Sequence, residues 1–324
     1  MSPSPKTFLI VGATGNTGKA VVLELARLLP ASESFFGYRI LALTRSATSQ
    51  AAQDLAKHGV EVEEYSWPEI TADWLQKRNV RRAFIASHNE PHHFAEESTF
   101  HREALEAGVN YVVRISTTAA NVEPDCRAYY PRAHWAIEHM LSQPQYSNLQ
   151  WTSLQPNVFH AYYLNTAAQF IHEHHKSGNV KAGRLHLQAN EDGLTAPIDP
   201  GEVGIVAARL LGQEDVGPYN HAKLVLQGPT DITGRDIVRM VERRIGTKVE
   251  DIKYKDLAYL DEYFQKGPHS CNVMSSIKYA FIVGWDGKNT ADTTSEQVRK
   301  LGPPTVGPEE ALDKMIAALK MQHA

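Results

Sequence analysis

The 324-residue sequence predicts an α/β protein with a doubly wound parallel sheet, and three observations support this prediction. Four consecutive apolar residues, Phe8 to Val11, run directly into the glycine-rich stretch Gly12 to Gly18. Apolar positions at helical spacing follow this stretch until Pro30 stops them. Further short apolar runs alternate with amphipathic stretches as far as Phe159, which is typical of β-strands and α-helices in alternation.

The glycine-rich stretch is predicted to cradle the pyrophosphate of a dinucleotide. Gly12 lets the chain turn off the strand, Gly15 leaves no Cβ in the way of a pyrophosphate, and Gly18 lets the helix lie close to the strand. The spacing is GxxGxxG, and the first turn of the following helix would face the phosphates. The expected cofactor-binding residues of this stretch are Gly12, Thr14, Gly15, Asn16, Thr17 and Gly18.

The second apolar strand, Tyr38 to Thr44, ends at Arg45 and Ser46. An acidic residue at this place takes the ribose hydroxyls in NAD-binding folds, and its charge would repel a 2′-phosphate. A guanidinium flanked by hydroxyls would instead pair with that phosphate. We therefore expect NADP(H) as the cofactor, with Arg45 as a ligand; the alternative is an ordinary surface arginine.

Polar residues follow the next predicted strands at the points where those strands end. Val60 to Tyr65 fits a third strand, and Arg82 to Ala86 a fourth that leads into Ser87 and His88. The carboxyl ends of parallel strands face the cofactor crevice, so both side chains should lie near the adenosine or the pyrophosphate. A local hydrogen bond is the alternative role for His88.

The fifth predicted strand, Tyr111 to Ile115, ends in Ser116 and Thr117, whose hydroxyls would touch the nicotinamide ribose or a substrate carbonyl, or else cap the next turn. A helix over Tyr129 to Leu141 then places Tyr130 and His134 on one face, because they are four residues apart. An imidazole donates or accepts a proton near neutral pH, so His134 is a candidate catalytic residue; packing alone is the alternative.

Beyond a sixth strand, Trp151 to Gln155, the regular alternation ends. A helix is expected up to about Lys176, then a candidate strand over Gly183 to Leu187 and a strand over Lys223 to Gln227. The cofactor-binding core is expected over residues 1–155, completed by about 196–227. Residues 156–195 and 228–324 are expected to form a smaller, mostly helical lobe for the substrate.

Composition limits the partners and the location of the protein. A net charge of −4 without a lysine or arginine run argues against a nucleic-acid surface, and small molecules are the expected partners. Two cysteines without metal-type spacing favour a reducing compartment, and no metal is expected from the histidine spacing. We expect a soluble cytoplasmic protein without a signal peptide or a membrane span. The sequence carries no indication of its oligomeric state.

Six separated segments resemble, in order, the NmrA-like family of atypical short-chain dehydrogenases: VGATGNTG, Arg45 after the second strand, AGVNYVVRIST, YYPRAHWAIEHML, LQPNVF and VLQGPTDITGRDI. The resemblance implies a Rossmann fold, a preference for NADP(H), and a C-terminal lobe that closes a cleft over the nicotinamide. It also implies that Ser116 and Thr117 lie near the nicotinamide. The loop beside the nicotinamide matches Gln155, Pro156, Asn157 and Phe159, with Val158 between them.

The sequence departs from the general short-chain dehydrogenase pattern at one position. These enzymes use a Tyr-x-x-x-Lys pair, and the matching residues here are Tyr130 and His134, so the lysine is absent. The expected catalytic residues are His134, Tyr130 and Ser116. The resemblance implies an NADPH-dependent oxidoreductase acting on a small apolar or aromatic carbonyl, enone, imine or quinone-type substrate. The alternatives are an NADP(H) sensor that binds a protein such as a transcription factor, and an isomerase or cyclase that retains its cofactor.

Overall fold

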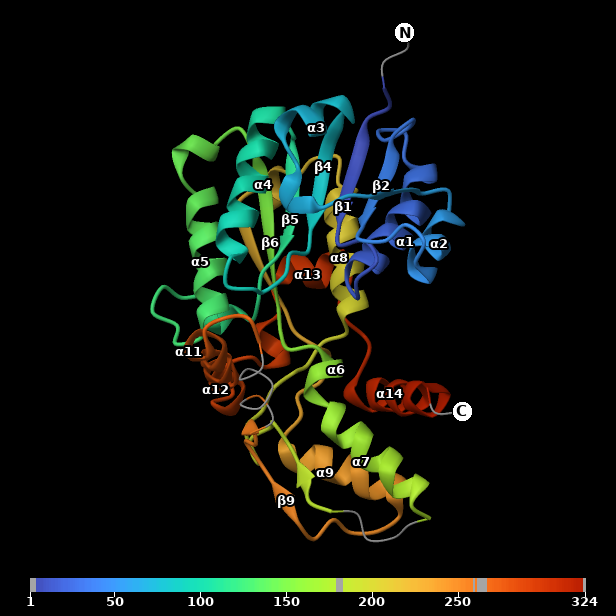
Figure 1. The fold of residues 1–324 in the computed structure, drawn as a ribbon, viewed down its shortest axis with the longest axis vertical. Helices are drawn as coiled ribbons and strands as arrows, with labels where there is room; N and C mark the ends of the chain where they lie inside the picture. Colours follow the sequence, from blue (N-terminus) through green and yellow to red (C-terminus); the bar gives the residue numbers. More distant parts are fainter. Residues whose placement is uncertain (1–3, 179–182, 259, 261–266, 323–324) are drawn as a thin grey trace.

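A computed structural model describes residues 4–178, 183–258, 260 and 267–322 (Figure 1). Its main feature is a seven-stranded parallel sheet in the order β3-β2-β1-β4-β5-β6-β8, which confirms the predicted doubly wound α/β fold. The strands are β1 (Thr7–Val11), β2 (Arg39–Thr44), β3 (Glu61–Glu64), β4 (Val80–Ile85), β5 (Tyr111–Ile115), β6 (Gln150–Pro156) and β8 (Ala222–Leu226).

Helices cover both faces of the sheet, which explains the unbroken apolar run of β1. Phe8 and Ile10 pack into a core on one face, whereas Leu9 and Val11 pack into a core on the other. The first face carries α1 (Gly18–Leu28) and α8 (Pro200–Leu211), with α2 (Gln50–Ala56) beside them. The second face carries α3 (Ala72–Lys77), α4 (His93–Ala107) and α5 (Tyr129–Leu141).

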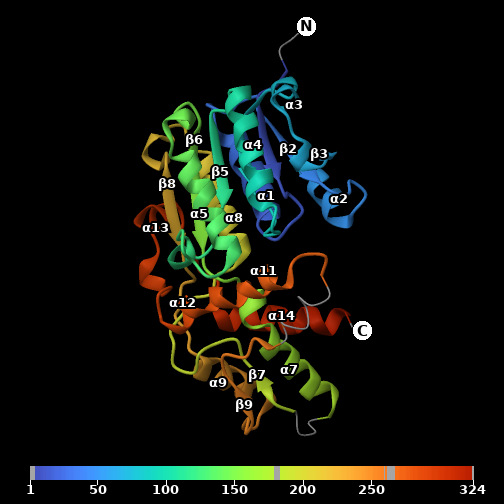
Figure 2. The same ribbon diagram turned by 60° about the vertical axis from the view of Figure 1, so that its left-hand side comes forward.

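A second lobe lies beyond the carboxyl ends of the strands, at the lower end of the molecule in Figures 1 and 2. Its own apolar core includes Ala168, Ile171, Leu185, Val241 and Leu312. The elements that build it are α6 (His160–Tyr163), α7 (Asn165–Lys176), β7 (Leu185–His186), α9 (Gly234–Ile245), β9 (Ile252–Lys253) and α14 (Pro308–Gln322).

The lobe differs in detail from the sequence-based expectation. The single helix expected up to Lys176 is two helices, because the chain leaves the helix at Leu164 between α6 and α7. The expected strand over 183–187 pairs through only two residues, in a small parallel sheet with β9. Residues 179–182 lie outside the described part of the chain.

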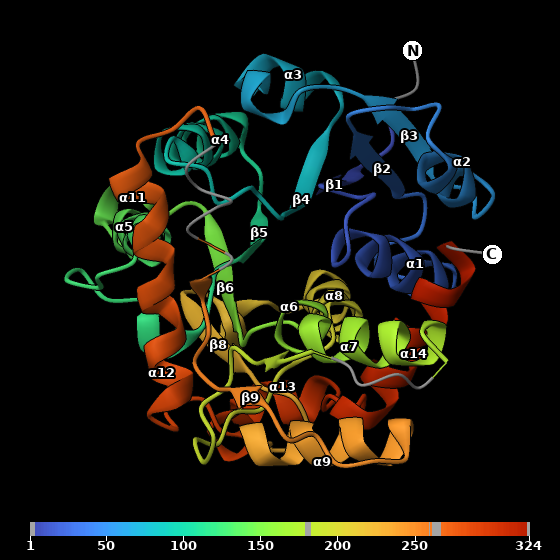
Figure 3. The same cartoon turned by 60° about the horizontal axis from the view of Figure 1, so that its bottom comes forward.

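The C-terminal part of the chain returns from the lobe to the main sheet. The helices α11 (Cys271–Ser275) and α12 (Ile282–Trp285), joined by a 3₁₀ segment over Ser276–Phe281, run beside α5 (Figure 3). The Tyr129 amide donates a hydrogen bond of 3.1 Å to the Ser276 hydroxyl. Next, α13 (Glu296–Leu301) packs on β8 and α8. Among the described residues, no helix is long and apolar enough to cross a bilayer.

Candidate functional site

A cavity of about 930 Å³ opens where the carboxyl ends of the parallel strands meet the second lobe. Parallel sheets place ligands at this edge, and the volume falls in the range of about 300 to 1,000 Å³ usual for ligand sites. The predicted site residues that line it are Gly12, Thr14, Gly15, Asn16, Thr17, Gly18, Arg45, Ser87, His88, Ser116, Thr117, Tyr130, His134, Pro156, Asn157 and Phe159.

The glycine loop between β1 and α1 forms one wall of the cavity. Gly12 has a φ of 78°, and a Cβ on Gly18 would lie 2.1 Å from the Gly12 carbonyl oxygen, so both positions require glycine. A Cβ on Gly15 would meet only the Gly12 oxygen, at 3.2 Å. No side chain caps the start of α1, and its first turn holds no acidic residue. The positive dipole end of this helix therefore suits an anionic ligand.

Arg45 stands at the end of β2, where the loop that carries it is held by local hydrogen bonds. The Ser46 amide donates to the Thr44 hydroxyl at 3.2 Å, and the Ala47 amide donates to a Glu64 carboxylate oxygen at 2.9 Å. The Arg45 side chain is exposed and takes part in no hydrogen bond or ion pair with the residues the structure describes. Its positive charge is therefore available to an anion at this end of the cavity.

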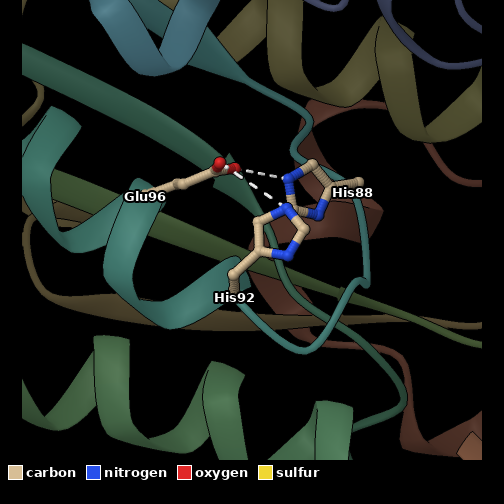
Figure 4. Close-up of side chains that lie close together, drawn as sticks. All are labelled: His88, His92 and Glu96. Carbon is tan, nitrogen blue, oxygen red and sulfur yellow. Dashed lines mark hydrogen bonds and ion pairs between the residues drawn. The ribbon is translucent and has the colours of Figure 1, made fainter. Parts of the chain in front are cut away.

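The loop after β4 contributes Ser87 and His88 to the wall. The Ser87 hydroxyl donates to the Glu97 carboxylate at 2.6 Å and thus anchors the loop on α4. His88, His92 and Glu96 bring their ligand atoms within 4.8 Å of one another at the rim (Figure 4). The sequence spacing of the histidines alone did not reveal that α4 supplies this carboxylate.

The protonation of His88 argues against metal binding by this group. The Glu90 amide donates to His88 Nδ1 at 3.1 Å, so the ring proton resides on Nε2, which lies 2.5 Å from Glu96 Oε2. Coordination through Nε2 would require that proton to move to Nδ1 and break the bond from the amide. A second group of possible ligands, His93, Glu97 and His134, surrounds Arg114, whose positive charge opposes a cation there.

A fully buried arginine, Arg114 on β5, organises the polar side chains behind the cavity wall. It donates from Nε to Glu97 at 2.5 Å, from Nη1 to the Ser153 hydroxyl at 2.9 Å, and from Nη2 to His134 Nδ1 at 2.8 Å. Ser153 in turn donates to Glu138 at 2.7 Å. Burial alone would raise the pKa of Glu97, but Arg114 and two histidines outweigh it and hold that pKa well below its usual range.

This arrangement fixes the tautomer of His134. An arginine can only donate, so His134 Nδ1 must accept and the ring proton must reside on Nε2. Nε2 lies 3.2 Å from the Asn89 side-chain oxygen. Burial, with the added charge of Arg114, lowers the pKa of His134 well below its usual range. At neutral pH, His134 is therefore a neutral hydrogen-bond donor.

Hydroxyl groups occupy the wall formed by the end of β5 and the start of α5. Burial raises the pKa of Tyr130, against a smaller opposing effect of its hydrogen bond with Thr117. The Ser116 side chain is buried, and its oxygen has no hydrogen-bond partner among the described residues. These groups can donate hydrogen bonds to an oxygen of a ligand, but they release a proton reluctantly at neutral pH.

The loop after β6 also lines the cavity. Asn157 is buried; its amide group donates to the Ala196 carbonyl at 2.7 Å, and its side-chain oxygen accepts from Asn289 at 2.7 Å. Phe159 stacks on Tyr162, with ring centroids 6.4 Å apart. Gln155 is not among the residues that line the cavity, because its amide turns to the buried carboxylate of Glu138 at 3.2 Å.

Aromatic and apolar side chains also line the cavity from α6 and from the segment that contains α11 and α12: Tyr163, Met274, Ile277, Phe281 and Trp285. The sequence reasoning did not place Met274, Ile277, Phe281 and Trp285 at the cavity, and it also missed Asn89 and Arg114. One signal for Arg114 was present, since a charged residue inside the apolar strand YVVRI must find buried partners. The C-terminal residues carried no comparable signal.

Comparison with known proteins identifies relatives of this fold. An NADPH-dependent quinone oxidoreductase from Escherichia coli is similar over 95% of this chain and 99% of its own, with a TM-score of 0.69 and 20% identity. A triphenylmethane reductase of Citrobacter sp., complexed with NADP(H), gives the same values. NmrA, a negative transcriptional regulator, matches 99% of this chain and 98% of its own, with a TM-score of 0.69 and 12% identity.

No curated protein matched the chain significantly. The model of the NmrA-like family matched residues 4–298, which is most of the sequence. On this match the protein belongs to the NmrA-like family.

Proposed function

We propose that this protein is an NADPH-dependent oxidoreductase that transfers hydride to a small apolar or aromatic electrophile. The observation that carries the proposal is the division of the cavity wall. One end presents the glycine loop, the uncapped start of α1 and the unpaired charge of Arg45. The other end presents aromatic side chains, among them Tyr163 and Trp285. A charged dinucleotide and an apolar acceptor would meet between them.

The residues of the first end fit NADP(H). The glycine loop and the first turn of α1 would hold the pyrophosphate, and Arg45 would pair with the 2′-phosphate. Ser87 and His88 would lie beside the adenosine half, and Thr117 and Asn157 beside the nicotinamide half. We assign residues 1–155 and 196–227 to cofactor binding, and residues 156–195 and 228–324 to the substrate.

The protonation states of Tyr130 and His134 favour one class of substrate over the others. When bound, NADPH supplies the hydride. The raised pKa of Tyr130 leaves a hydrogen-bond donor that orients an oxygen atom but holds its proton, and the lowered pKa of His134 leaves a neutral imidazole whose one N–H is directed at Asn89. A quinone suits such a site, because its reduced anion is delocalised and takes a proton from water. A simple ketone would require a stronger acid.

Two of the similar proteins act in this way by name: a quinone oxidoreductase that depends on NADPH and a triphenylmethane reductase bound to NADP(H). Both names fit an apolar, conjugated acceptor. At 20% identity these two proteins share the fold with this chain, and their class of reaction enters here as part of the proposal.

The proposal is tested first by binding and then by turnover. Calorimetric titration should give tighter binding of NADP⁺ and NADPH than of NAD⁺. NADPH oxidation should then be faster with a quinone than with an aldehyde, an enone or an imine. If the protein binds none of these nucleotides, the proposal is wrong. If it binds them but reduces none of these acceptors, the catalytic part of the proposal is wrong.

A second function, an NADP(H)-dependent regulator of a protein partner, is favoured by one observation. His134 occupies the place of the short-chain dehydrogenase lysine and is already bound to Arg114 and Asn89. The similar fold of NmrA agrees with such a role. Capture of a partner whose affinity changes with the ratio of NADP⁺ to NADPH would support it, whereas affinity independent of the ratio would contradict it.

A further inference from the structure

We propose that Asn89 is a ligand-binding residue whose side-chain amide group donates a hydrogen bond to an oxygen atom in the cavity, and that Arg114 and His134 fix this direction. The inference rests on the proposed function, since the oxygen belongs either to the nicotinamide half of the cofactor or to the substrate. It adds a recognition element that the glycine loop and Arg45 do not provide.

The hydrogen bond between Arg114 and His134 runs from the guanidinium to the imidazole. The guanidinium has five N–H donors and no acceptor, so its contact of 2.8 Å with His134 Nδ1 has one possible sense. Both side chains are at most 2% exposed. The direction of this hydrogen bond cannot be reversed, because a proton on His134 Nδ1 would then face a buried N–H group of the guanidinium.

The hydrogen bond between Arg114 and His134 also fixes the direction of the bond between His134 and Asn89. With Nδ1 as the acceptor, His134 Nε2 must bear the proton and donate it to the Asn89 side-chain oxygen at 3.2 Å. An asparagine side chain has one oxygen acceptor and two N–H donors. The bond from His134 therefore engages the oxygen and assigns the –NH₂ group to the opposite side.

Asn89 is an exposed residue in the loop after β4, and it lines the cavity. The Tyr129 hydroxyl donates to its backbone carbonyl, which holds the loop against α5. The –NH₂ group forms no hydrogen bond with any residue in the described ranges, so both N–H donors remain available to a ligand.

The charges behind the wall maintain this state. The groups that face His134 are Arg114, Glu97, His93 and Tyr130. Glu97 and Glu138 balance Arg114 and the partly exposed Lys223, whose ammonium lies 3.4 Å from Glu138. A further positive charge on His134 would be uncompensated, so the imidazole stays neutral and its donor remains directed at Asn89.

The test replaces the amide by a carboxylate of the same shape. Asn89→Asp keeps an oxygen for His134 and places a second oxygen where the N–H donors stood. Asn110→Asp makes the same chemical change at an exposed residue next to the amino end of β5 and is the matched control. Affinities for NADP⁺ and NADPH are measured by calorimetry, and kcat and KM by NADPH oxidation with a quinone.

Two results would support the proposal and distinguish the source of the oxygen. A rise of about tenfold or more in the dissociation constant of NADP⁺ would place the oxygen on the cofactor. An unchanged dissociation constant with a comparable fall in kcat/KM for the quinone would place it on the substrate. In both cases His134→Gln, which retains one acceptor and one donor, should preserve more function than His134→Leu.

Two results would overturn it. If the wild-type protein binds NADP(H) and Asn89→Asp behaves like Asn110→Asp in both assays, this inference is wrong while the proposed function stands. If the wild-type protein binds neither NADP⁺ nor NADPH, both are wrong.

Discussion

Arg45 is the side chain that we expect to distinguish NADP(H) from NAD(H). Replacing it by alanine removes a charge-assisted contact to the 2′-phosphate, so we expect the affinity for NADP⁺ to fall by about tenfold to a hundredfold. The affinity for NAD⁺, which lacks this phosphate, should stay the same. Calorimetric titration of both nucleotides measures the difference.

Arg102→Ala is the control for this prediction, because Arg102 is an exposed arginine on α4 that pairs with Glu106 on the same helix. An equal loss of affinity for the two nucleotides, or none for NADP⁺, would contradict the role of Arg45.

His160 makes the stability of the protein depend on pH. It begins α6, is 2% exposed, and neither ring nitrogen has a hydrogen-bond partner among the described residues. Burial lowers its pKa to about 4; the charge of Asp199 raises this pKa by a smaller amount, and the charge of Lys314 lowers it slightly further. The unfolded chain binds a proton at His160 below about pH 6.5, and the folded chain does not until about pH 4. The free energy of unfolding therefore falls as the pH decreases through this range.

Urea unfolding at pH 7.5 and pH 5 measures this effect. At pH 5, the contribution of His160 to the loss is roughly 2 kcal/mol. In His160→Phe the difference between the two pH values should be smaller by about that amount, whereas the exposed His58→Phe should leave it unchanged. His101 and His134, whose pKa values are also lowered, account for a loss that remains in the variant. An unchanged difference in His160→Phe would disprove the assignment.

At the scale of elements, the start of α1 depends on close packing with α8. A Cβ on Gly204 of α8 would lie 2.4 Å from the Thr17 carbonyl oxygen and 2.7 Å from the Ala20 Cβ. Gly204→Ala should therefore displace the turn that faces the anionic end of the cavity. We expect a fall of about 1 to 3 kcal/mol in the free energy of unfolding and weaker binding of NADP⁺.

Gly307→Ala tests the same substitution where a new Cβ would meet nothing within 4 Å. Urea unfolding and calorimetry compare the two variants. If Gly204→Ala matches Gly307→Ala in both measurements, then contact between α1 and α8 does not position the loop.

The elements that the sequence predicted well are those whose signal is local. β1 is an apolar run because helices cover both faces of the sheet, and α9 begins with a capping box between Thr233 and Asp236 and ends at Gly246, with a φ of 73°. The break at Leu164 and the two-residue pairing of β7 with β9 depend on contacts between distant segments. Periodicity alone does not contain that information.

At the scale of the whole molecule, the candidate site was predictable on one side only. The glycine loop, Arg45 and the strand ends were expected at one edge, because the carboxyl ends of parallel strands meet there. A segment more than a hundred residues after β6 also lines this cavity, through Ile277, Phe281 and Trp285. No pattern in the sequence predicts that this segment lies beside the main sheet. The two sides of the cavity are brought together only by the complete fold.

Because both parts of the chain line one cavity, a bound cofactor should stabilise the whole molecule. NADP⁺ at a hundred times its dissociation constant is expected to raise the free energy of unfolding by about 2.7 kcal/mol. In Arg45→Ala at the same concentration, the increase should be only about 1.4 kcal/mol after a tenfold loss of affinity, or about 0.4 kcal/mol after a hundredfold loss. Urea unfolding with and without NADP⁺ measures both values.

Hydrogen exchange locates this stabilisation. NADP⁺ and a non-reducible quinone analogue together should slow amide exchange in the glycine loop and also in Cys271–Trp285, since Met274, Ile277 and Phe281 line the same cavity as the glycine loop. With NADP⁺ alone, the slowing should be strongest in the glycine loop and in β2. Protection that never extends beyond the main sheet would mean that the C-terminal segment does not contact the ligands and that the substrate lies elsewhere.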